Sequence, residues 1–306
     1  ALLLGMGGSS LAPQVFRDTF GVKPVYLDLQ VLDSTDPGAV LSVSESLDLS
    51  KTIFIVSTKS GGTVETLSFF KYFYNQILKQ VGRDLAGEHF IAITDPGSSL
   101  ESLAGELKFR KIFLNNPDIG GRYSALSYFG LVPAALLGID LEKLLNRAKD
   151  TQSFECFVEE PEDSVSVQLG IIMGILAGKG IDKLTFILSS DLSYFGIWVE
   201  QLIAESTGKE GKGILPVAGE PVLSPDSYAA DRLFIYLKTS KSSEHEQKVS
   251  QLLSAGLPVI RIEMDDIYDI GRQYFIWELA TAIAGWMLQI NPFDQPNVES
   301  AKKVSK

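Results

Sequence analysis

The sequence predicts an α/β protein made of two similar domains, each built on a parallel sheet. Short apolar runs rich in branched residues alternate with longer helical patterns, an order typical of strand–helix–strand units. The alternation stops at an acidic stretch carrying Pro161 and then starts again. This break places one domain at residues 1–150, a linker at 151–164 and a second domain at 165–306. A chain of 306 residues is long enough to give each domain its own core.

Each element is predicted from its local pattern. In the first half we expect strands at residues 2–4, 25–29, 53–56, 90–93 and 112–114. A helix is predicted over 67–78, and one long amphipathic segment over 128–148 closes the domain. The second half continues with apolar segments at 167–176, 184–188, 197–204, 233–237 and 259–262 and ends in a long helix over about 272–289.

Composition excludes several classes of function. The formal net charge of -11 argues against nucleic acid or an anionic membrane as partner, because both require basic surfaces. No apolar run reaches the roughly 18 residues that a membrane span needs. Cys156 is the only cysteine, and His89 and His245 are far apart, so we expect no intrachain disulfide and no metal site. We expect no signal peptide and a cytoplasmic location, because no basic segment precedes the first apolar residues.

Two polar loops follow predicted strands and suit a phosphate group. Glycine lets the backbone approach an anion, and hydroxyls and free N–H groups at a helix start can donate to it. Because ligands bind beyond the carboxyl ends of parallel strands, both loops lie where a site is expected. The candidate phosphate-binding residues are Gly8, Ser9, Thr58, Lys59, Ser60 and Thr63.

Other interpretations of these loops remain open. Ser, Thr and Gly are common turn and cap residues, and for one loop alone that explanation is favoured. Residues 5–10 nearly fit the dinucleotide fingerprint G-x-G-x-x-G/A, with Asp28 at a plausible distance for a ribose contact, but Ser10 replaces the third small residue. The segment 207–213 is not a Walker loop, since no Ser or Thr follows a Gly-Lys pair.

Three further segments carry candidate catalytic residues. Gln201 and Glu205 lie four apart near the end of a predicted helix, so both point to one face, and a partly buried carboxylate there could act as a general base. Arg122 follows two glycines and could stabilise a developing negative charge. Gln295 and Lys302 lie seven apart along one predicted helical face. Taken singly, a surface glutamate, a structural ion pair and a solvated terminal lysine are the ordinary explanations.

Together these motifs resemble the glucose-6-phosphate isomerase family, which is built from two sugar-isomerase (SIS) domains. The stretches Trp198-Val-Glu-Gln-Leu-Ile-Ala-Glu-Ser-Thr-Gly and Ile290-Asn-Pro-Phe-Asp-Gln-Pro-Asn-Val-Glu look most like the isomerase part of bifunctional transaldolase/phosphoglucose isomerases. The resemblance covers nearly the whole chain. It implies two doubly wound parallel-sheet domains of flavodoxin-like style, with the phosphate loops in the first and the glutamate and terminal lysine in the second.

The resemblance also implies a role for each candidate residue. Glu205 matches the base that moves a proton between C1 and C2 of the open-chain sugar, and Arg122 matches the group that stabilises the cis-enediolate. Lys302 matches the lysine that assists ring opening. Gln201 and Gln295 match substrate-contacting glutamines, and the two polar loops match the cradle of the 6-phosphate. The family's ring-opening histidine has no clear match, and His245 is the nearest candidate.

The implied function is interconversion of glucose 6-phosphate and fructose 6-phosphate in glycolysis and gluconeogenesis, without a cofactor. The implied partners are the sugar phosphate and a second copy of the chain in a homodimer. A non-catalytic SIS module that binds or senses a sugar phosphate is the alternative, but it would not need Glu205, Arg122 and Lys302 together. A nicotinamide-dependent oxidoreductase ranks third.

Overall fold

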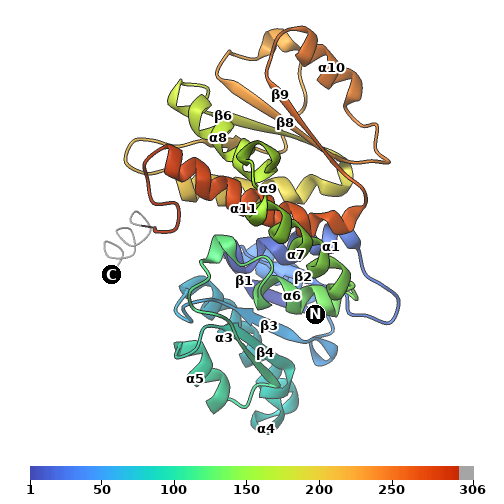
Figure 1. Cartoon of the computed structure of the whole chain (residues 1–306). Helices are drawn as coiled ribbons and strands as arrows, with labels where there is room; N and C mark the ends of the chain where they lie inside the picture. The colour runs from blue at the N-terminus through green and yellow to red at the C-terminus, as the bar shows by residue number, and fades with distance from the viewer. Residues whose placement is uncertain (296–306) are drawn as a thin grey trace. The chain divides into compact units, whose positions relative to one another are not determined.

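The computed structural model describes residues 1–295, which form two compact units that divide after Leu141. The first unit contains a five-stranded parallel sheet in the order β2-β1-β3-β4-β5 (Figure 1). This is the strand order of flavodoxin-like folds, so the predicted fold class is confirmed for this unit. Its strands are β1 (Leu2–Gly5), β2 (Gln30–Leu32), β3 (Phe54–Ser57), β4 (Phe90–Thr94) and β5 (Lys111–Leu114).

Helices connect these strands. In chain order they are η1 (Gly7–Ser9), α1 (Leu11–Phe20), α2 (Pro37–Ser46), η2 (Leu49–Lys51), α3 (Val64–Val81), α4 (Arg83–Ala86), η3 (Gly87–His89), α5 (Ser99–Glu106), η4 (Gly121–Tyr123) and α6 (Tyr128–Leu136), where η marks a 3-10 helix.

The core of the first unit follows from the alternation of side chains along its strands. Phe54 on β3 and Phe90 on β4 point to one face of the sheet, where Phe73 of α3 and Leu100 of α5 pack against them. The rings of Phe54 and Phe90 stack with centroids 4.9 Å apart. These contacts fix α3 against the sheet, and α3 begins directly after the polar loop that follows β3.

The second unit is built on a four-stranded parallel sheet in the order β7-β6-β8-β9. Its strands are β6 (Lys183–Leu188), β7 (Leu215–Val217), β8 (Arg232–Thr239) and β9 (Val259–Met264). Its helices are α7 (Leu141–Phe157), η5 (Pro161–Asp163), α8 (Val165–Gly178), η6 (Ser190–Leu192), α9 (Ser193–Thr207), η7 (Pro225–Ser227), α10 (Glu246–Ser254), η8 (Ile267–Asp269) and α11 (Ile270–Met287). Helix α11 packs along α8 and α9, and its Trp277 contacts Phe186 of β6 at 5.1 Å between ring centroids.

Two predicted elements differ from the structure. Residues 25–29 are not a strand: Val25 has a φ of 68°, and the N–H groups of Lys23 and Leu27 bond to carbonyls at the end of α6. The neighbouring β2 (Gln30–Leu32) pairs with β1 instead. The predicted segment 128–148 is two helices, α6 and α7, because the chain turns at Gly138 with a φ of 81°.

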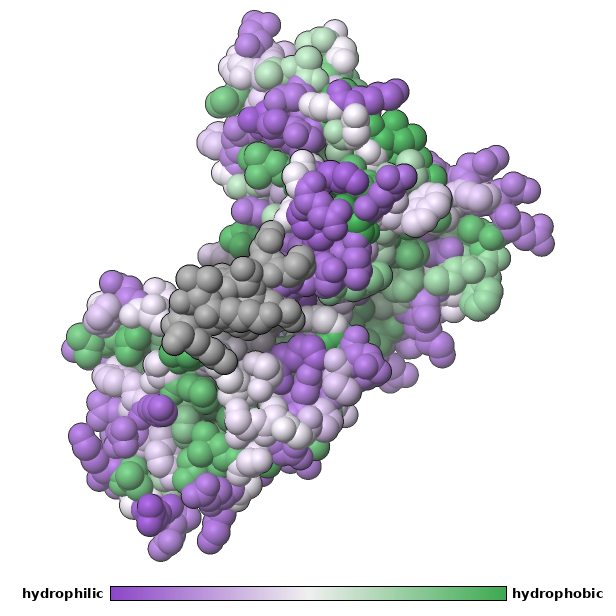
Figure 2. Space-filling view, turned by 90° about the vertical axis from the view of Figure 1, so that its left-hand side faces the viewer, coloured by the Kyte–Doolittle hydropathy of each residue, from purple (hydrophilic) through white to green (hydrophobic). Residues whose placement is uncertain are grey.

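The domain boundary also lies earlier than the sequence suggested. The two compact units divide after Leu141, not at 150, and residues 151–157 of the expected linker are the end of α7. Edge strand β7 and helix α10 had no counterpart in the sequence-based prediction. Within residues 1–295, no helix combines the length and apolar character that a membrane span requires. Hydrophilic and apolar residues alternate in small groups over the visible surface (Figure 2).

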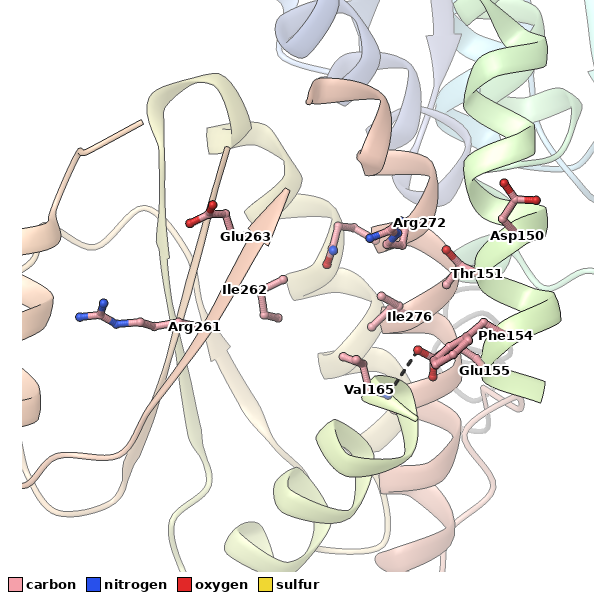
Figure 3. A pocket seen from close by; sticks show the side chains of 11 residues that line it. Asp150, Thr151, Phe154, Glu155, Val165, Arg261, Ile262, Glu263, Arg272 and Ile276 are labelled. Carbon is pink, nitrogen blue, oxygen red and sulfur yellow. Dashed lines mark hydrogen bonds between the residues drawn. The ribbon is translucent and has the colours of Figure 1, made fainter. Parts of the chain in front are cut away.

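The buried carboxylate of Glu155 holds the start of α8. Its oxygens accept hydrogen bonds from the Ser164 hydroxyl, from the Ser166 N–H at 2.9 Å and from the Val165 N–H at 3.3 Å, the last drawn as a dashed line in Figure 3. A negative charge at a helix N-terminus is stabilising, and buried N–H groups that lose their acceptor are costly.

Replacing Glu155 with alanine is therefore expected to lower the free energy of unfolding by about 2–3 kcal/mol, measured by urea denaturation. The matched control is Glu159→Ala, because Glu159 is exposed just beyond the end of α7, the helix that carries Glu155. A change at Glu155 no larger than that at Glu159 would show that the three bonds contribute little.

Candidate active site

The two predicted phosphate loops leave neighbouring strands side by side. Gly5, the last residue of β1, is the register partner of Ser57, the last residue of β3. The Ser57 hydroxyl donates to the carbonyl of Ser9 at 3.1 Å and so joins the two loops directly. The loops therefore share one edge of the first sheet, as the sequence predicts for parallel strands.

The second loop presents hydroxyls at the start of an 18-residue helix. The Thr58 and Thr63 hydroxyls lie 2.9 Å apart and bond to each other. Thr63 is the N-cap of α3, yet its side chain makes no capping bond to the helix. Exposed Ser60 lies between them, and its hydroxyl accepts from the Gly62 N–H at 3.3 Å. Hydroxyls and N–H groups thus gather at the positive end of the α3 dipole, an arrangement that can hold an anion.

Lys59 connects this loop to the ends of the next two strands. Its ammonium pairs with the carboxylate of Asp95, which follows β4, and donates to the carbonyl of Pro117 at 2.7 Å, beyond β5. Asp95 was not among the residues predicted from the sequence, although an acidic residue directly after a buried strand is a usable signal. The pairing shows that the Lys59 charge is balanced by Asp95, which also holds the loop in place.

Arg122 is carried by a loop that packs against the first phosphate loop. It lies in η4, and its side chain is buried, with only 3% of the residue exposed. A Cβ atom on Gly8 would lie 2.2 Å from the carbonyl oxygen of Gly121, so only glycine allows this close backbone approach. The Ser124 hydroxyl donates to the same Gly121 carbonyl at 2.7 Å. The loop that contains Gly8 and the loop that contains Gly121 and Arg122 are therefore in direct backbone contact.

Glu205 lies on the last turn of α9 in the second unit, between two amides. The Gln201 Nε2 donates to one carboxylate oxygen at 2.9 Å, and the Gln295 Nε2 donates to the other at 3.1 Å. Gln201 is one helical turn away, whereas Gln295 is 90 residues further along the chain. The carboxylate is half-buried, and a hydrogen bond to each oxygen fixes its plane, as a positioned general base requires.

The sequence profile of the phosphoglucose isomerase family matches residues 1–214. The chain belongs to this family. A probable glucose-6-phosphate isomerase from Methanococcus maripaludis is 28% identical to it, over 99% of this chain and 77% of that protein. A hypothetical protein from Thermus thermophilus superposes with a TM-score of 0.88 at 25% identity, covering 99% of this chain and 82% of that one. A glucose-6-phosphate isomerase from Chlamydia trachomatis shares the fold, with a TM-score of 0.82 at 20% identity and coverages of 99% and 68%.

The site residues predicted from the sequence are distributed over both units. Seven of them lie in the first unit, namely Gly8, Ser9, Thr58, Lys59, Ser60, Thr63 and Arg122, and three lie in the second, namely Gln201, Glu205 and Gln295. Lys302 lies outside the described residues. The His89 ring nitrogen Nδ1 lies 3.2 Å from the Thr52 carbonyl, and His245 is the N-cap residue of α10 with a φ of 66°.

A separate cavity of about 540 Å³ lies between α7, β9 and α11 (Figure 3). Apolar side chains such as Phe154 and Ile276 line it together with charged ones such as Arg272 and Glu263. None of its lining residues belongs to the groups around Glu205 or the phosphate loops. The candidate base Glu205, at the end of α9, therefore lies outside that cavity.

Proposed function

We propose that this protein is a glucose-6-phosphate isomerase, which interconverts glucose 6-phosphate and fructose 6-phosphate in glycolysis and gluconeogenesis. The observation that carries the proposal is the Glu205 carboxylate, held by one amide on each oxygen at the end of α9. Relatives named glucose-6-phosphate isomerase cover 99% of the chain and support it. A sugar-phosphate binding module without catalysis would have no use for a carboxylate oriented in this way.

The phosphate of the substrate is recognised by the two loops of the first unit. The hydroxyls of Ser9, Thr58, Ser60 and Thr63 and the N–H groups at the start of α3 donate to its oxygens, and Gly8 allows close approach of the backbone. Lys59 keeps the second loop in position through its ion pair with Asp95. Binding at the phosphate leaves the sugar carbons free for chemistry.

Isomerisation is a proton transfer next to a carbonyl. Glu205 takes the proton from C2 of open-chain glucose 6-phosphate, and the electron pair forms a C1–C2 double bond, giving a cis-enediolate. The same carboxyl returns the proton to C1 while the hydroxyl proton moves from O2 to O1, giving fructose 6-phosphate. Gln201 and Gln295 keep the carboxylate in position, and Arg122 stabilises the negative charge of the enediolate. Lys302 assists ring opening, and the chemistry uses no cofactor.

The direct test is conversion of fructose 6-phosphate to glucose 6-phosphate, measured with a coupled dehydrogenase assay. We expect turnover without added metal or nucleotide. Absence of turnover together with retained binding of fructose 6-phosphate, measured by calorimetry, would instead favour a sugar-phosphate sensing module. A thermal shift with NAD would point to the third-ranked class, the oxidoreductases.

Replacing Ser60 with alanine is expected to raise KM for fructose 6-phosphate about tenfold and leave kcat nearly unchanged. A hydrogen bond to a charged group contributes roughly 1.5–3 kcal/mol, and a phosphate contact acts equally in the ground and transition states. The control is Ser68→Ala, because the hydroxyl of exposed Ser68 on α3 donates to the Val64 carbonyl of its own helix at 2.8 Å. Equal kinetic constants for the two variants would show that the Ser60 hydroxyl does not bind the phosphate.

We further propose a homodimer in the cytoplasm. The dimer follows from the family resemblance, and its test is the mass in solution by light scattering. The single cysteine, Cys156, is compatible with a reducing compartment.

A further inference from the structure

A short turn after α9 reaches across to the chain that follows α11. Lys209 and Lys212 form an isolated antiparallel bridge around the turn residues Glu210 and Gly211, both of which have positive φ angles. The Lys212 ammonium donates to the carbonyl of Leu288 at 2.7 Å, at the end of α11. Two lysines of one turn thus reach the same distant segment, although only one of them is buried.

Lys209 is the buried lysine. Only 4% of its side chain is exposed, and its ammonium donates to the Asn291 carbonyl at 2.6 Å, to the Asp294 carbonyl at 2.9 Å and to the Asp294 carboxylate at 2.7 Å. These three bonds use all three donors of an ammonium group. A buried charge is tolerated only when it is paired and hydrogen-bonded, so this side chain requires the 291–294 loop in one conformation.

The loop held by Lys209 delivers Gln295 to the general base. Gln295 directly follows Asp294, and its Nε2 donates to one oxygen of Glu205 at 3.1 Å. The other oxygen is bound by Gln201 from α9 itself, which needs no help from the loop. The bond from Gln295 to the carboxylate therefore depends on a segment that Lys209 fixes.

We propose that Lys209 is a positioning residue for isomerisation: by holding the 291–294 loop it places Gln295 on Glu205 and fixes the plane of the carboxylate that moves the proton. The inference rests on the proposed function of Glu205 as base. A displaced loop withdraws the Gln295 amide from Glu205 and admits water. The proton on the carboxyl group then exchanges with solvent before it is returned to the sugar.

The test compares Lys209→Met with Lys212→Met in the full chain. Lys209→Met is expected to lower kcat about tenfold with KM for fructose 6-phosphate changed less than about twofold, and to raise deuterium incorporation per turnover in D2O. Lys212→Met is expected to change kcat less than about twofold, because the ammonium of exposed Lys212 donates to the Leu288 carbonyl at the end of α11, outside the 291–294 loop. A merely structural role of Lys209 would lower the melting temperature of Lys209→Met without raising its deuterium incorporation per turnover, and that result would overturn the inference.

A double-mutant cycle with Gln295→Ala identifies the route of the effect. If Lys209 acts through Gln295, the double variant loses little more activity than either single variant, well short of the product of the two losses. A loss of kcat in the double variant equal to the product of the two single losses would overturn the inference. Should Lys209→Met not fold, Asp294→Asn removes the charged partner alone, and an unchanged kcat and unchanged deuterium exchange there would equally overturn it.

The same experiments separate this inference from the proposed function. An inactive wild type, or a Glu205→Gln variant with full activity, would contradict the proposed function whatever Lys209 does. An active wild type, an inactive Glu205→Gln variant and a Lys209→Met variant with wild-type kcat and exchange would reject the role of Lys209 alone.

Discussion

Replacing Glu205 with glutamine is expected to lower kcat for isomerisation by about 10³-fold, the middle of the range for loss of a general base. The amide has the shape of the carboxylate but cannot accept the C2 proton. Its NH2 group would also face one of the two donor amides, Gln201 or Gln295, which now bind the two carboxylate oxygens. Turnover of fructose 6-phosphate in the coupled assay measures the loss, and calorimetry shows whether binding of the sugar phosphate is retained.

The matched control is Glu200→Gln. Glu200 is an exposed glutamate on the same helix, α9, so the substitution makes the same change of charge away from the two glutamines. We expect its kcat to remain within about twofold of the wild type. Similar losses in both variants would mean that the negative charge of α9 matters in general and that Glu205 is not the base.

Replacing Gly8 with alanine is expected to reduce kcat about 100-fold and to lower the free energy of unfolding by about 1–3 kcal/mol. The added Cβ would lie 2.2 Å from the Gly121 carbonyl oxygen and 2.6 Å from its carbon, so one of the two backbones must move. Gly8 belongs to the first phosphate loop, and Gly121 directly precedes Arg122. A single methyl group therefore disturbs both the phosphate contact and the cation proposed to stabilise the enediolate.

Gly105→Ala is the control for this substitution. A Cβ on Gly105 meets no atom within 4 Å, and helix α5 favours alanine over glycine by up to about 1 kcal/mol. Steady-state kinetics and urea denaturation of both variants measure the difference. A Gly8→Ala enzyme with wild-type kcat would show that the two loops can separate without affecting catalysis, which would contradict their proposed joint role.

Local patterns were sufficient to predict much of the fold. Strands β1, β3 and β4 are short apolar runs that are buried along their whole length in a parallel sheet, and such runs are recognisable in isolation. The edge strand β5 is partly exposed, and its apolar residues 112–114 were sufficient to predict it. The polar loops after β1 and β3 could be placed at one sheet edge, since parallel strands end together. Edge strand β7 was missed because it has three residues and contains Pro216, which suits an edge but weakens the pattern of a strand.

The sequence-based prediction of secondary structure was wrong where a contact with a distant segment decides the local conformation. Residues 25–29 have the composition of a strand, but the Leu27 N–H bonds to the Leu136 carbonyl at the end of α6, more than 100 residues away. No local pattern carries that information. The break between α6 and α7 was signalled by Gly138, but the apolar periodicity on both sides outweighed it in the sequence-based prediction.

The sequence by itself determined which chemical groups the protein has: a carboxylate and a glutamine one helical turn apart, hydroxyl-rich loops at strand ends, and an arginine after two glycines. Only the tertiary structure showed which groups support them. Gln295 reaches Glu205, Asp95 pairs with Lys59, and Lys209 holds the 291–294 loop, each through a contact between segments far apart in the chain. Hydrogen bonds act over about 3 Å of space whatever the separation in sequence, so these partners exist only once the chain has folded.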